Sequence, residues 1–509
     1  MSMPAESLTS IVTLQDLLAG IVAAPPVPIS GITADSRLLR PGDVFLACQG
    51  ATSHGLDYLD QAVAAGISAV VWDSSTHKDP QTDVPGIVPT IGVDGLSGRL
   101  GEIANRWFSN PSEDLQVVGV TGTNGKTTVA FLVQQCLQAL DRKCGYVGTL
   151  GGGMSVTTSE TSMTTPPCVE LHEQLASFRD EGAGYAAIEV SSHALEQRRV
   201  DGVKFDTAIF TNLSRDHIDY HGGMRDYFES KARLFLEYDV RHRIVSLDSE
   251  FGAELAERCG QDVIAVSTRF DRITDGRLHV FARSIVATPA GSNISFATSW
   301  GDADLSLPLA GEFNVANAAE VLACLLCHDV SLNDACDVLE NVCAPPGRMQ
   351  RVQAATDAIL PTVYVDYSHT PASLEAALKA LRGHCSAQLW CVFGCGGDRD
   401  RGKRSMMGKI AGRLADISVV TSDNPRTEVP AKIIAEILEG MHADTISIED
   451  RGDAIAHAIH CASAGDTILI AGKGHEDYQV IGTETHHFSD VEVATHNLEQ
   501  RAHSGADEQ

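Results

Sequence analysis

The sequence of 509 residues lacks the features that would place a protein in a membrane or outside the cell. No apolar run approaches the roughly 18 residues that a membrane span needs, so we expect no such span. The N-terminal segment MSMPAESLTS has no basic stretch followed by an apolar core, so we expect no signal peptide. The 13 cysteines are scattered, and no second pair follows Cys324 and Cys327 at zinc-site spacing. We therefore expect a cytoplasmic protein whose cysteines fill apolar cores.

Basic residues are also scarce, with 38 Lys and Arg against 67 Asp and Glu, which gives a net charge of −29. Such a chain has no general surface for nucleic acid or for an anionic membrane. Small anionic ligands are not excluded, because glycine loops and a few cationic side chains can bind them. An apolar content of 43% and this length predict a folded protein of several domains. We also find no internal repeat and no low-complexity tract.

The order of predicted strands and helices divides the chain into three α/β blocks, which span residues 1–112, 113–344 and 345–509. The second boundary is marked by Ala344-Pro345-Pro346-Gly347, a stiff segment that cannot continue a helix. In the last block four β-rich segments alternate with helical patterns, one of which starts with Thr370 as N-cap and Pro371 in the first turn. This alternation predicts a Rossmann-like parallel sheet with helices on both faces.

The most informative segment is residues 117–128, which read VVGVTGTNGKTT. A short β-branched run predicts a buried strand, and the glycines that follow let backbone N–H groups surround phosphate oxygens at a helix N-terminus. Lys126 would neutralise the terminal phosphates, and the Thr127 hydroxyl would ligate magnesium. The loop departs from the usual pattern at its first position, where Val120 replaces the expected glycine. The nearest preceding glycine, Gly119, lies one residue earlier in the chain. We predict a nucleotide-binding loop, the alternative being a glycine-rich turn without a ligand; its residues are Gly122, Thr123, Asn124, Gly125, Lys126, Thr127 and Thr128.

Acids and histidines follow two further predicted strands of the middle block. Glu189 ends the strand YAAIE, and an acid at the carboxyl end of a strand beside a phosphate loop is suited to hold magnesium. A strand over 207–213 leads into the segment SRDHIDYHG, residues 214–222, and then into a helix that carries Lys231. By spacing alone this second cluster is a transition-metal site, a second magnesium site or an ordinary solvated loop.

Eight short motifs in order now resemble the Mur ligases, and the resemblance covers roughly Asp35 to Gln479. The motifs are VTGTNGKTT, EVSSHALEQRRV, TNLSRDHIDYHG with ESKARLF, EFNVANAAEVLA, PPGRMQRV, VDYSHTPASLEAAL, GCGGDRDRGKR and DNPRTE. The resemblance implies a small UDP-binding domain, a central P-loop ATPase domain with a mostly parallel sheet and a C-terminal amino-acid-binding domain. It also implies ATP and two magnesium ions as cofactors.

The resemblance assigns roles to individual residues of the nucleotide and metal sites. Thr127 and Glu189 match the first magnesium site, and His217 matches a ligand of the second. Lys231 matches a lysine that these ligases carbamylate, a change that turns an ammonium into an anion able to hold a metal. The remaining nucleotide positions are Asn314 and Asn317 near adenine, and Arg348 and Asp366 over the γ-phosphate and ribose.

The nucleotide-sugar substrate is expected to bind along a path of short polar residues. The segment around Ser36 resembles a UDP-binding segment, whereas Ala51-Thr52-Ser53 departs from the His-Gln-Ala of some relatives, which leaves the uracil contacts open. The residues that match the path of the muramoyl-peptide are Thr164, Thr165, Ser191, Gln197 and Arg199.

The implied reaction joins an amino acid to UDP-N-acetylmuramoyl-L-alanyl-D-glutamate through an acyl phosphate, with release of ADP and phosphate. All four predicted strands of the last block end in polar loops, and ligands of open parallel sheets bind at that edge. The sequence DNPR, which ends at Arg426, is similar to the signature of ligases that add meso-diaminopimelate, whose second carboxylate an arginine can pair. We expect the amino acid to contact Arg399, Asp423, Asn424, Arg426, Gly472 and Glu476.

Three other functions stay open from the sequence. A ligase of the same fold could add L-lysine, or glutamate to folate, although Ser36 and Arg426 argue against both. A regulatory P-loop ATPase would share only the phosphate loop and would not need four polar strand ends. We expect a monomer that binds small-molecule substrates and no nucleic acid.

Overall fold

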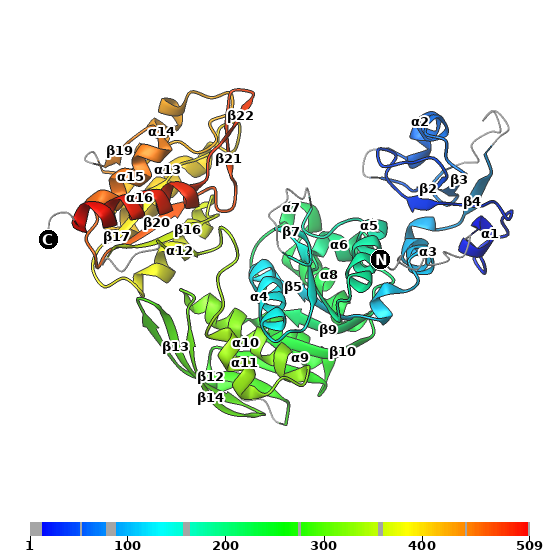
Figure 1. Ribbon diagram of the computed structural model, residues 1–509, viewed down its shortest axis with the longest axis horizontal. Coiled ribbons are helices and arrows are strands. Elements are labelled where there is room, and N and C mark those ends of the chain that lie inside the picture. Colours follow the sequence, from blue (N-terminus) through cyan, green and yellow to red (C-terminus); the bar gives the residue numbers. More distant parts are fainter. Residues whose placement is uncertain are drawn as a thin grey trace, which may run out of the picture. The chain divides into compact units, whose positions relative to one another are not determined.

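The computed structural model describes residues 13–50, 53–77, 88–155, 163–272, 276–354, 360–442 and 445–506. They fall into two compact units, each made of several chain segments (Figure 1). The first lies within Met1–Thr123, Asp141–Ile209 and Ser214–Arg243, and the second within Asn124–Leu140, Phe210–Leu213 and Ile244–Gln509. Ala51 and Thr52, in the predicted uracil segment, lie outside the described residues.

The first unit contains a four-stranded parallel sheet with both faces covered. Its strands follow one another in order as β1 (Gly31–Thr33), β2 (Asp43–Ala47), β3 (Ala69–Asp73) and β4 (Thr90–Val93). The helices are α1 (Leu14–Leu17), α2 (Leu59–Ala64) and α3 (Leu100–Trp107), with 3-10 turns η1 (Gly55–Tyr58), η2 (Leu96–Arg99) and η3 (Pro111–Glu113). Every residue of β2 and β3 is buried, because α1 and α3 pack on one face and η1 and α2 on the other.

The first unit also contains the strand that leads into the predicted phosphate loop. The strand order is β9 (Phe205–Phe210), β5 (Gln116–Thr121), β8 (Tyr185–Glu189), β6 (Cys144–Gly148) and β7 (Gly151–Gly153). The helices are α5 (Cys168–Asp180), α6 (Ser192–Glu196), α7 (Ile218–His221) and α8 (Met224–Leu236). Strands β5, β8 and β6 are parallel, and β7 pairs antiparallel with β6. The predicted strands that precede the loop and Glu189 are therefore confirmed, whereas the third strand ends at Phe210 rather than Leu213.

The second unit begins with α4 (Lys126–Ala139), which packs against α10 (Glu312–Cys327). Its first strands lie in the order β14 (Gly301–Leu307), β13 (Gly291–Thr298), β12 (His279–Thr288), β11 (Val263–Ser267) and β10 (Val240–Ser246). Of β10, residues 244–246 belong to this unit. Helices α9 (Glu250–Cys259) and α11 (Leu332–Leu339) and the 3-10 turn η4 (Phe270–Arg272) accompany these strands. The antiparallel hairpins of β12, β13 and β14 were not predicted from the sequence.

The predicted parallel sheet of the last block is confirmed. Six strands lie in the order β15 (Gln350–Val352), β16 (Thr362–Asp366), β20 (Thr467–Ala471), β17 (Leu389–Phe393), β18 (Ile417–Val420) and β19 (Ile446–Ser447). All pairs are parallel except that of β15 with β16. The remaining elements are α12 (Pro371–Arg382), α13 (Gly402–Leu414), α14 (Pro430–Leu438), α15 (Arg451–Cys461), α16 (Asp490–Ala506) and the hairpin β21 (Tyr478–Ile481) with β22 (Glu484–His487).

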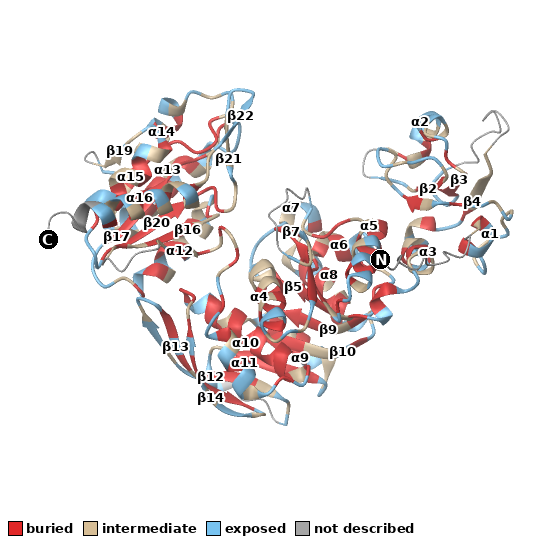
Figure 2. Ribbon diagram, in the orientation of Figure 1, coloured by how far each residue is buried: buried red, intermediate tan, exposed pale blue. Residues whose placement is uncertain are grey.

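Helices cover both faces of this sheet, as the alternation of elements predicts. Helices α12, α13 and α14 share one apolar core with the strands, and α15 and α16 share the other. Figure 2 shows the central strands β16, β17 and β20 of this sheet as largely buried and parts of the helices as exposed. Thr370 caps α12 through Ser373, with Pro371 in the first turn, which confirms the predicted helix start. The polar ends of β16, β17, β18 and β20 therefore lie along one edge of a rigid sheet.

Candidate active site

The predicted phosphate loop joins the end of β5 at Thr121 to the start of α4 at Lys126. Gly125 has a positive φ of 88°, and a Cβ atom there would lie 2.6 Å from the Asn317 Oδ1 atom, so the position requires glycine. The peptide of Asn124 is fixed on both sides: its N–H donates to Asn212 Oδ1 (3.1 Å), and its carbonyl accepts from Thr211 Oγ1 (2.6 Å). Thr211 and Asn212, which follow directly after β9, thus hold the loop through their side chains.

Lys126 and Thr127 are the first residues of α4, a helix of 14 residues. Backbone N–H groups at a helix start have no partner within the helix and carry partial positive charge, which suits an anion. Asn317 lies against this loop, donates to Asn314 Oδ1 (3.0 Å) and is buried, while Asn314 donates to the Ala310 carbonyl (2.8 Å). The structure thus brings Asn317 to the loop, and a contact of either asparagine with adenine stays a prediction.

Glu189, at the end of β8, pairs in register with Val120 of β5 and is fully buried. Its Oε1 atom accepts from the Tyr146 hydroxyl (2.5 Å) and the Thr149 N–H (2.8 Å), and Oε2 accepts from Thr149 Oγ1 (3.3 Å). A Cβ on Gly148 would lie 2.1 Å from Oε1, so the glycine makes room for the carboxylate. A buried carboxylate needs such donors. Tyr146 and Thr149 were not singled out from the sequence, where their one signal is their place in and just after a buried strand.

Lys231 of α8 is 1% exposed, and its Nζ atom donates to the Gly122 carbonyl (2.7 Å) and lies 4.6 Å from the centre of the Tyr227 ring. An unmodified ammonium has no lone pair for a metal, whereas a carbamate offers oxygen atoms. The structure therefore places Lys231 at the loop and leaves its carbamylation a prediction.

Three histidines gather beside this lysine. The ring centres of His193 and His217 are 5.0 Å apart, and those of His193 and His221 are 5.4 Å apart. Burial lowers the pKa of His193 and of His221, which favours neutral rings. His217 has a left-handed backbone (φ 52°) and an exposed side chain. Of the three alternatives for residues 214–222, a preformed transition-metal site is not supported, because the described residues contain no group of three or more His, Cys, Asp or Glu suited to a metal.

The donors predicted for magnesium nevertheless fit that ion chemically. A threonine hydroxyl, a carboxylate and a carbamate all supply the oxygen ligands that magnesium prefers. Glu189 Oε2 accepts from Thr149 Oγ1 (3.3 Å), and each oxygen of a carboxylate has more than one lone pair. The assignment of Thr127, Glu189, His217 and Lys231 to metal stays a prediction.

The structure brings the five residues of the predicted muramoyl-peptide path together next to Glu189. The Thr164 hydroxyl accepts from the Thr149 hydroxyl (3.2 Å). The Thr165 hydroxyl donates to the Glu189 carbonyl (2.6 Å) and accepts from the Ser191 N–H (3.1 Å). The Arg199 guanidinium donates to the Thr165 carbonyl (2.9 Å) and to Gln197 Oε1 (2.6 Å). Burial lowers the pKa of Arg199, and this guanidinium forms no ion pair with a carboxylate among the described residues. An uncompensated, half-buried guanidinium suits an anionic substrate.

Ser36 lies in the four-stranded part of the first unit, in a turn stabilised by its neighbours. Arg37 donates to both carboxylate oxygens of Asp35 (2.9 and 2.6 Å), and this pairing lowers the pKa of Asp35. The Ser36 carbonyl accepts from Gln61 Nε2 (3.1 Å). These bonds shape the turn, and a contact of Ser36 with a UDP group stays a prediction.

In the second unit, Arg348 lies over the ring of Tyr367, and Asp366 directly precedes Tyr367 in the chain. The Arg348 guanidinium lies 4.9 Å from the centre of the Tyr367 ring. Asp366, at the end of β16, accepts from Met349 N (2.8 Å) and from the N–H and hydroxyl of Ser368. Asp366 thus fixes the backbone next to Arg348.

The ends of β18 and β20 bring four of the predicted amino-acid contacts together. A Cβ on Gly472 would lie 2.5 Å from Asp423 Oδ2, and Asn424 Nδ2 donates to Glu476 Oε2 (2.9 Å). Lys473, which is fully buried and was not singled out from the sequence, donates to both Asn424 and Glu476 (3.4 and 3.3 Å). The loops after β18 and β20 therefore form one polar cluster.

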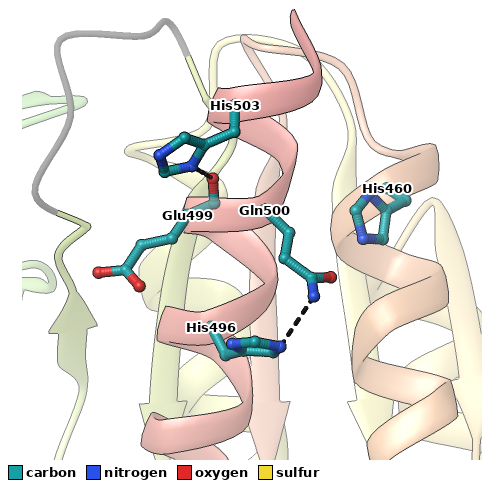
Figure 3. A pocket seen from close by; sticks show the side chains of 5 residues that line it. All are labelled: His460, His496, Glu499, Gln500 and His503. Carbon is teal, nitrogen blue, oxygen red and sulfur yellow. Dashed lines mark hydrogen bonds between the residues drawn. The ribbon is translucent and has the colours of Figure 1, made fainter.

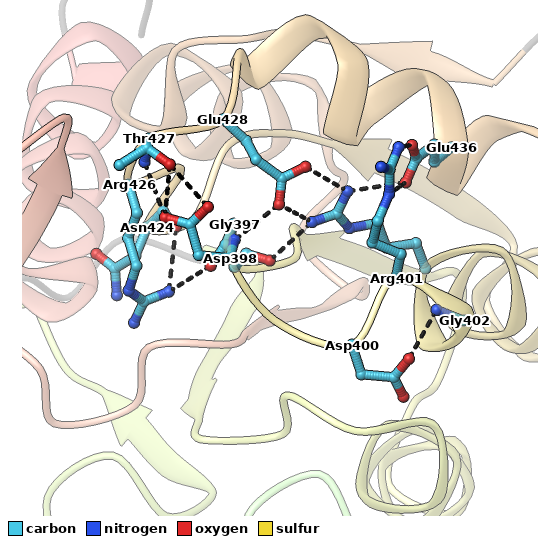
Figure 4. Close-up of polar contacts among 12 residues, drawn as sticks. Gly397, Asp398, Asp400, Arg401, Gly402, Asn424, Arg426, Thr427, Glu428 and Glu436 are labelled. Carbon is cyan, nitrogen blue, oxygen red and sulfur yellow. Dashed lines mark hydrogen bonds and ion pairs between the residues drawn. The ribbon is translucent and has the colours of Figure 1, made fainter.

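The two other predicted contacts are the arginines Arg399 and Arg426. Arg426 donates to the carbonyls of Gly397 (3.0 Å) and Asn424 (3.4 Å), as Figure 4 shows, and has a left-handed backbone with φ 51°. Arg399 is exposed. Neither guanidinium forms an ion pair with any described carboxylate, in contrast to the neighbouring Arg401 and Arg404. Two uncompensated guanidinium groups at this sheet edge suit a ligand with two carboxylates.

A cavity of about 480 Å³ lies elsewhere, on helices α15 and α16. Its lining residues, shown in Figure 3, are His460, His496, Glu499, Gln500 and His503. None belongs to a strand-end loop, and among the described residues these side chains do not form a group of three or more His, Cys, Asp or Glu suited to a metal. Of the helices in the described ranges, none combines the length and the apolar character that crossing a membrane requires.

Comparison with known proteins gives a family match for each of the three blocks. Residues 28–108 match the Mur ligase family catalytic domain, 120–325 the Mur ligase middle domain and 347–474 the Mur ligase glutamate ligase domain. A UDP-N-acetylmuramoyl-L-alanyl-D-glutamate--2,6-diaminopimelate ligase of Pseudomonas putida is 44% identical over 473 residues, which cover 92% of this chain and 94% of that protein.

Solved structures agree with these matches. One of a UDP-N-acetylmuramoyl-L-alanyl-D-glutamate--2,6-diaminopimelate ligase is 31% identical with a TM-score of 0.73, over 97% of this chain and 99% of that one. A MurF ligase from Thermotoga maritima in complex with ADP is 16% identical and shares the fold, with a TM-score of 0.59 over 93% and 98% of the two chains. The predicted three-part α/β fold and the resemblance are thus confirmed. This chain belongs to the Mur ligase family.

Proposed function

We propose that this chain is an ATP-dependent amide ligase that adds meso-diaminopimelate to UDP-N-acetylmuramoyl-L-alanyl-D-glutamate, with release of ADP and phosphate. This reaction belongs to the cytoplasmic synthesis of peptidoglycan precursors. The observation that carries the proposal is the 44% identity to a ligase of this name over 92% of the chain. The uncompensated Arg426 and Arg399 support the choice of a dicarboxylic amino acid over lysine.

The ATP-dependent step transfers the γ-phosphoryl group to the terminal D-glutamate carboxylate and so produces an acyl phosphate. Two anions must approach each other, and Lys126 and Arg348 neutralise part of that charge. Asn124 and Gly125 hold the loop so that backbone N–H groups point at the phosphates. The amine of diaminopimelate then attacks the acyl carbon, and phosphate leaves.

Magnesium would be held by Thr127, Glu189, His217 and a carbamylated Lys231. When bound, it would offset the negative charge of the phosphates. Tyr146 and Thr149 would keep Glu189 oriented through their hydrogen bonds.

The amino acid would bind at the carboxyl edge of the six-stranded sheet. Arg426 would pair its distal carboxylate, since a guanidinium fork matches the geometry of a carboxylate. Its ammonium would be bound by acceptors of Asp423, Asn424 and Glu476, with Gly472 allowing the close approach of the backbone. Arg399 supplies a second positive charge at this edge.

The nucleotide-sugar substrate would extend from Ser36 to the polar path beside Glu189, where Arg199 offers its guanidinium to an anionic group. We further propose domain boundaries near residues 112 and 344, a cytoplasmic location and a monomer.

An isotope experiment tests the acyl phosphate directly. The substrate peptide carries oxygen-18 in the D-glutamate carboxylate, and the phosphate released from ATP is analysed by mass spectrometry. The proposal predicts one labelled oxygen in each phosphate and equal amounts of ADP and tripeptide product. Unlabelled phosphate, or AMP and pyrophosphate instead of ADP, would overturn it.

A further inference from the structure

A buried arginine is connected through hydrogen bonds to the predicted site for diaminopimelate. The side chain of Arg404, on α13, is fully buried and forms ion pairs with Glu428 (2.7 Å) and Glu436 (2.8 Å). It contacts Glu428 through two nitrogens, at 2.7 Å to Oε1 and 3.0 Å to Oε2, and donates to the Gly396 carbonyl at 3.3 Å. Arg401 pairs with the outer side of Glu436. One buried guanidinium therefore links α13, the loop after β17 and the segment after β18.

Glu428 connects Arg404 to the turn at residues 396–398 through hydrogen bonds. Its Oε1 atom accepts from the Asp398 N–H (2.7 Å), while the Asp398 carboxylate accepts from Thr427 N (3.1 Å) and Thr427 Oγ1 (2.8 Å). Asp398 has a left-handed backbone with φ 54°. Figure 4 shows Glu428, Asp398 and Thr427 as one continuous chain of hydrogen bonds. Arg404 lowers the pKa of Glu428 to about 2, so the carboxylate stays ionised.

The turn at residues 396–398 orients the guanidinium of Arg426. The Gly397 carbonyl accepts from Arg426 Nη1 (3.0 Å), and the Gly397 N–H donates to the Asn424 carbonyl (2.9 Å). A Cβ on Gly397 would lie 1.9 Å from the Pro425 carbonyl oxygen, so the two loops are in direct contact. A shift of residues 396–398 must therefore move the acceptor that orients Arg426.

We propose that Arg404 is a positioning residue for the recognition of the distal carboxylate, acting through Glu428 and the turn at 396–398 on Arg426. The inference rests on the proposed function of Arg426. Lysine cannot form the forked contacts of a guanidinium, so Arg404→Lys preserves the charge but loses the geometry.

The test is steady-state kinetics of Arg404→Lys, with Arg413→Lys as the matched control. Arg413 lies on the same helix and pairs with Glu375 at the surface. For Arg404→Lys we expect the KM for diaminopimelate to rise about tenfold, which corresponds to about 1.4 kcal/mol, with kcat and the KM for ATP within about twofold. Arg413→Lys should leave all three unchanged. An equal rise in the KM of every substrate would indicate general damage and overturn the inference.

A double-variant cycle asks whether Arg404 acts through Arg426. In an Arg426→Ala background, Arg404→Lys should change the KM for diaminopimelate by less than about twofold, because the residue through which it acts is gone. A tenfold rise in both backgrounds would overturn the inference. Glu428→Gln serves where Arg404→Lys folds poorly, since Glu428 is partly exposed, and should raise the same KM. An inactive wild-type chain would refute the proposed function itself, whereas an active one with an unaltered Arg404→Lys refutes only this inference.

Discussion

Replacing Tyr146 by phenylalanine removes a single hydrogen bond from the buried Glu189 carboxylate and leaves the aromatic ring in place. The Tyr146 hydroxyl donates to Oε1 at 2.5 Å, and the Thr149 N–H also donates to that oxygen, at 2.8 Å. Glu189 is fully buried, so water does not readily replace the lost donor. A hydrogen bond to a charged group contributes about 1.5–3 kcal/mol, and the loss should fall in that range.

Two effects follow from this loss. The metal-free protein should unfold at a lower temperature, because one oxygen of a buried carboxylate has lost a donor. If Glu189 ligates magnesium, the concentration of magnesium needed for half-maximal phosphate release should also rise about 10–100-fold, as is typical when a residue that orients a ligand is removed.

The assays are a thermal unfolding curve in a chelator and a magnesium titration of phosphate release. Tyr185→Phe is the matched control, since Tyr185 begins the same strand that Glu189 ends and its hydroxyl accepts from Arg142 (3.2 Å). The control should alter neither the magnesium requirement nor kcat. An unchanged unfolding midpoint and magnesium curve for Tyr146→Phe would refute the reasoning.

Three further predictions concern other parts of the chain. Arg426→Ala should lower kcat/KM for diaminopimelate roughly 10–150-fold, as expected from the loss of hydrogen bonds to a charged group, and an unchanged preference over lysine in steady-state kinetics would contradict this. Gly125→Ala should weaken the affinity for ADP, measured by calorimetry, by tenfold or more. A φ of 88° costs an L-residue about 1–2 kcal/mol, and the new Cβ would lie 2.6 Å from Asn317 Oδ1. An unaltered affinity would contradict the loop geometry. Because pairing with Arg404 lowers the pKa of Glu428 from 4.5 to about 2, its contribution to stability is complete above pH 4.5 and is lost as the pH falls towards 2. Circular dichroism of Glu428→Gln should show a smaller loss of stability over that interval, and identical acid transitions would contradict the pairing.

The sequence predicted those parts of the fold whose signals are local. The strand around 117–120, the glycine-rich turn and the helix that follows it are all specified within a few residues, and the structure confirms each as β5, the loop and α4. The capped start of α12 and the parallel strands of the last block were predicted for the same reason.

Features that depend on distant segments were not predicted. The partners of Glu189 are Tyr146 and Thr149, 43 and 40 positions earlier, and no periodic pattern connects them. The hairpin strand β12 lacks a regular alternation of buried and exposed residues, because its register shifts between Ala282 and Ser284. Arg404 lies in a run of charged residues that would normally face solvent. Its burial depends on two distant carboxylates, Glu428 in the segment after β18 and Glu436 in α14.

The measurement that tests the central claim most directly is phosphate release from ATP in the presence of UDP-N-acetylmuramoyl-L-alanyl-D-glutamate. Three parallel reactions contain meso-diaminopimelate, L-lysine or no amino acid. The account predicts turnover with diaminopimelate alone. Equal turnover with lysine would contradict the role given to Arg426, and no turnover with either amino acid would contradict the proposed ligase.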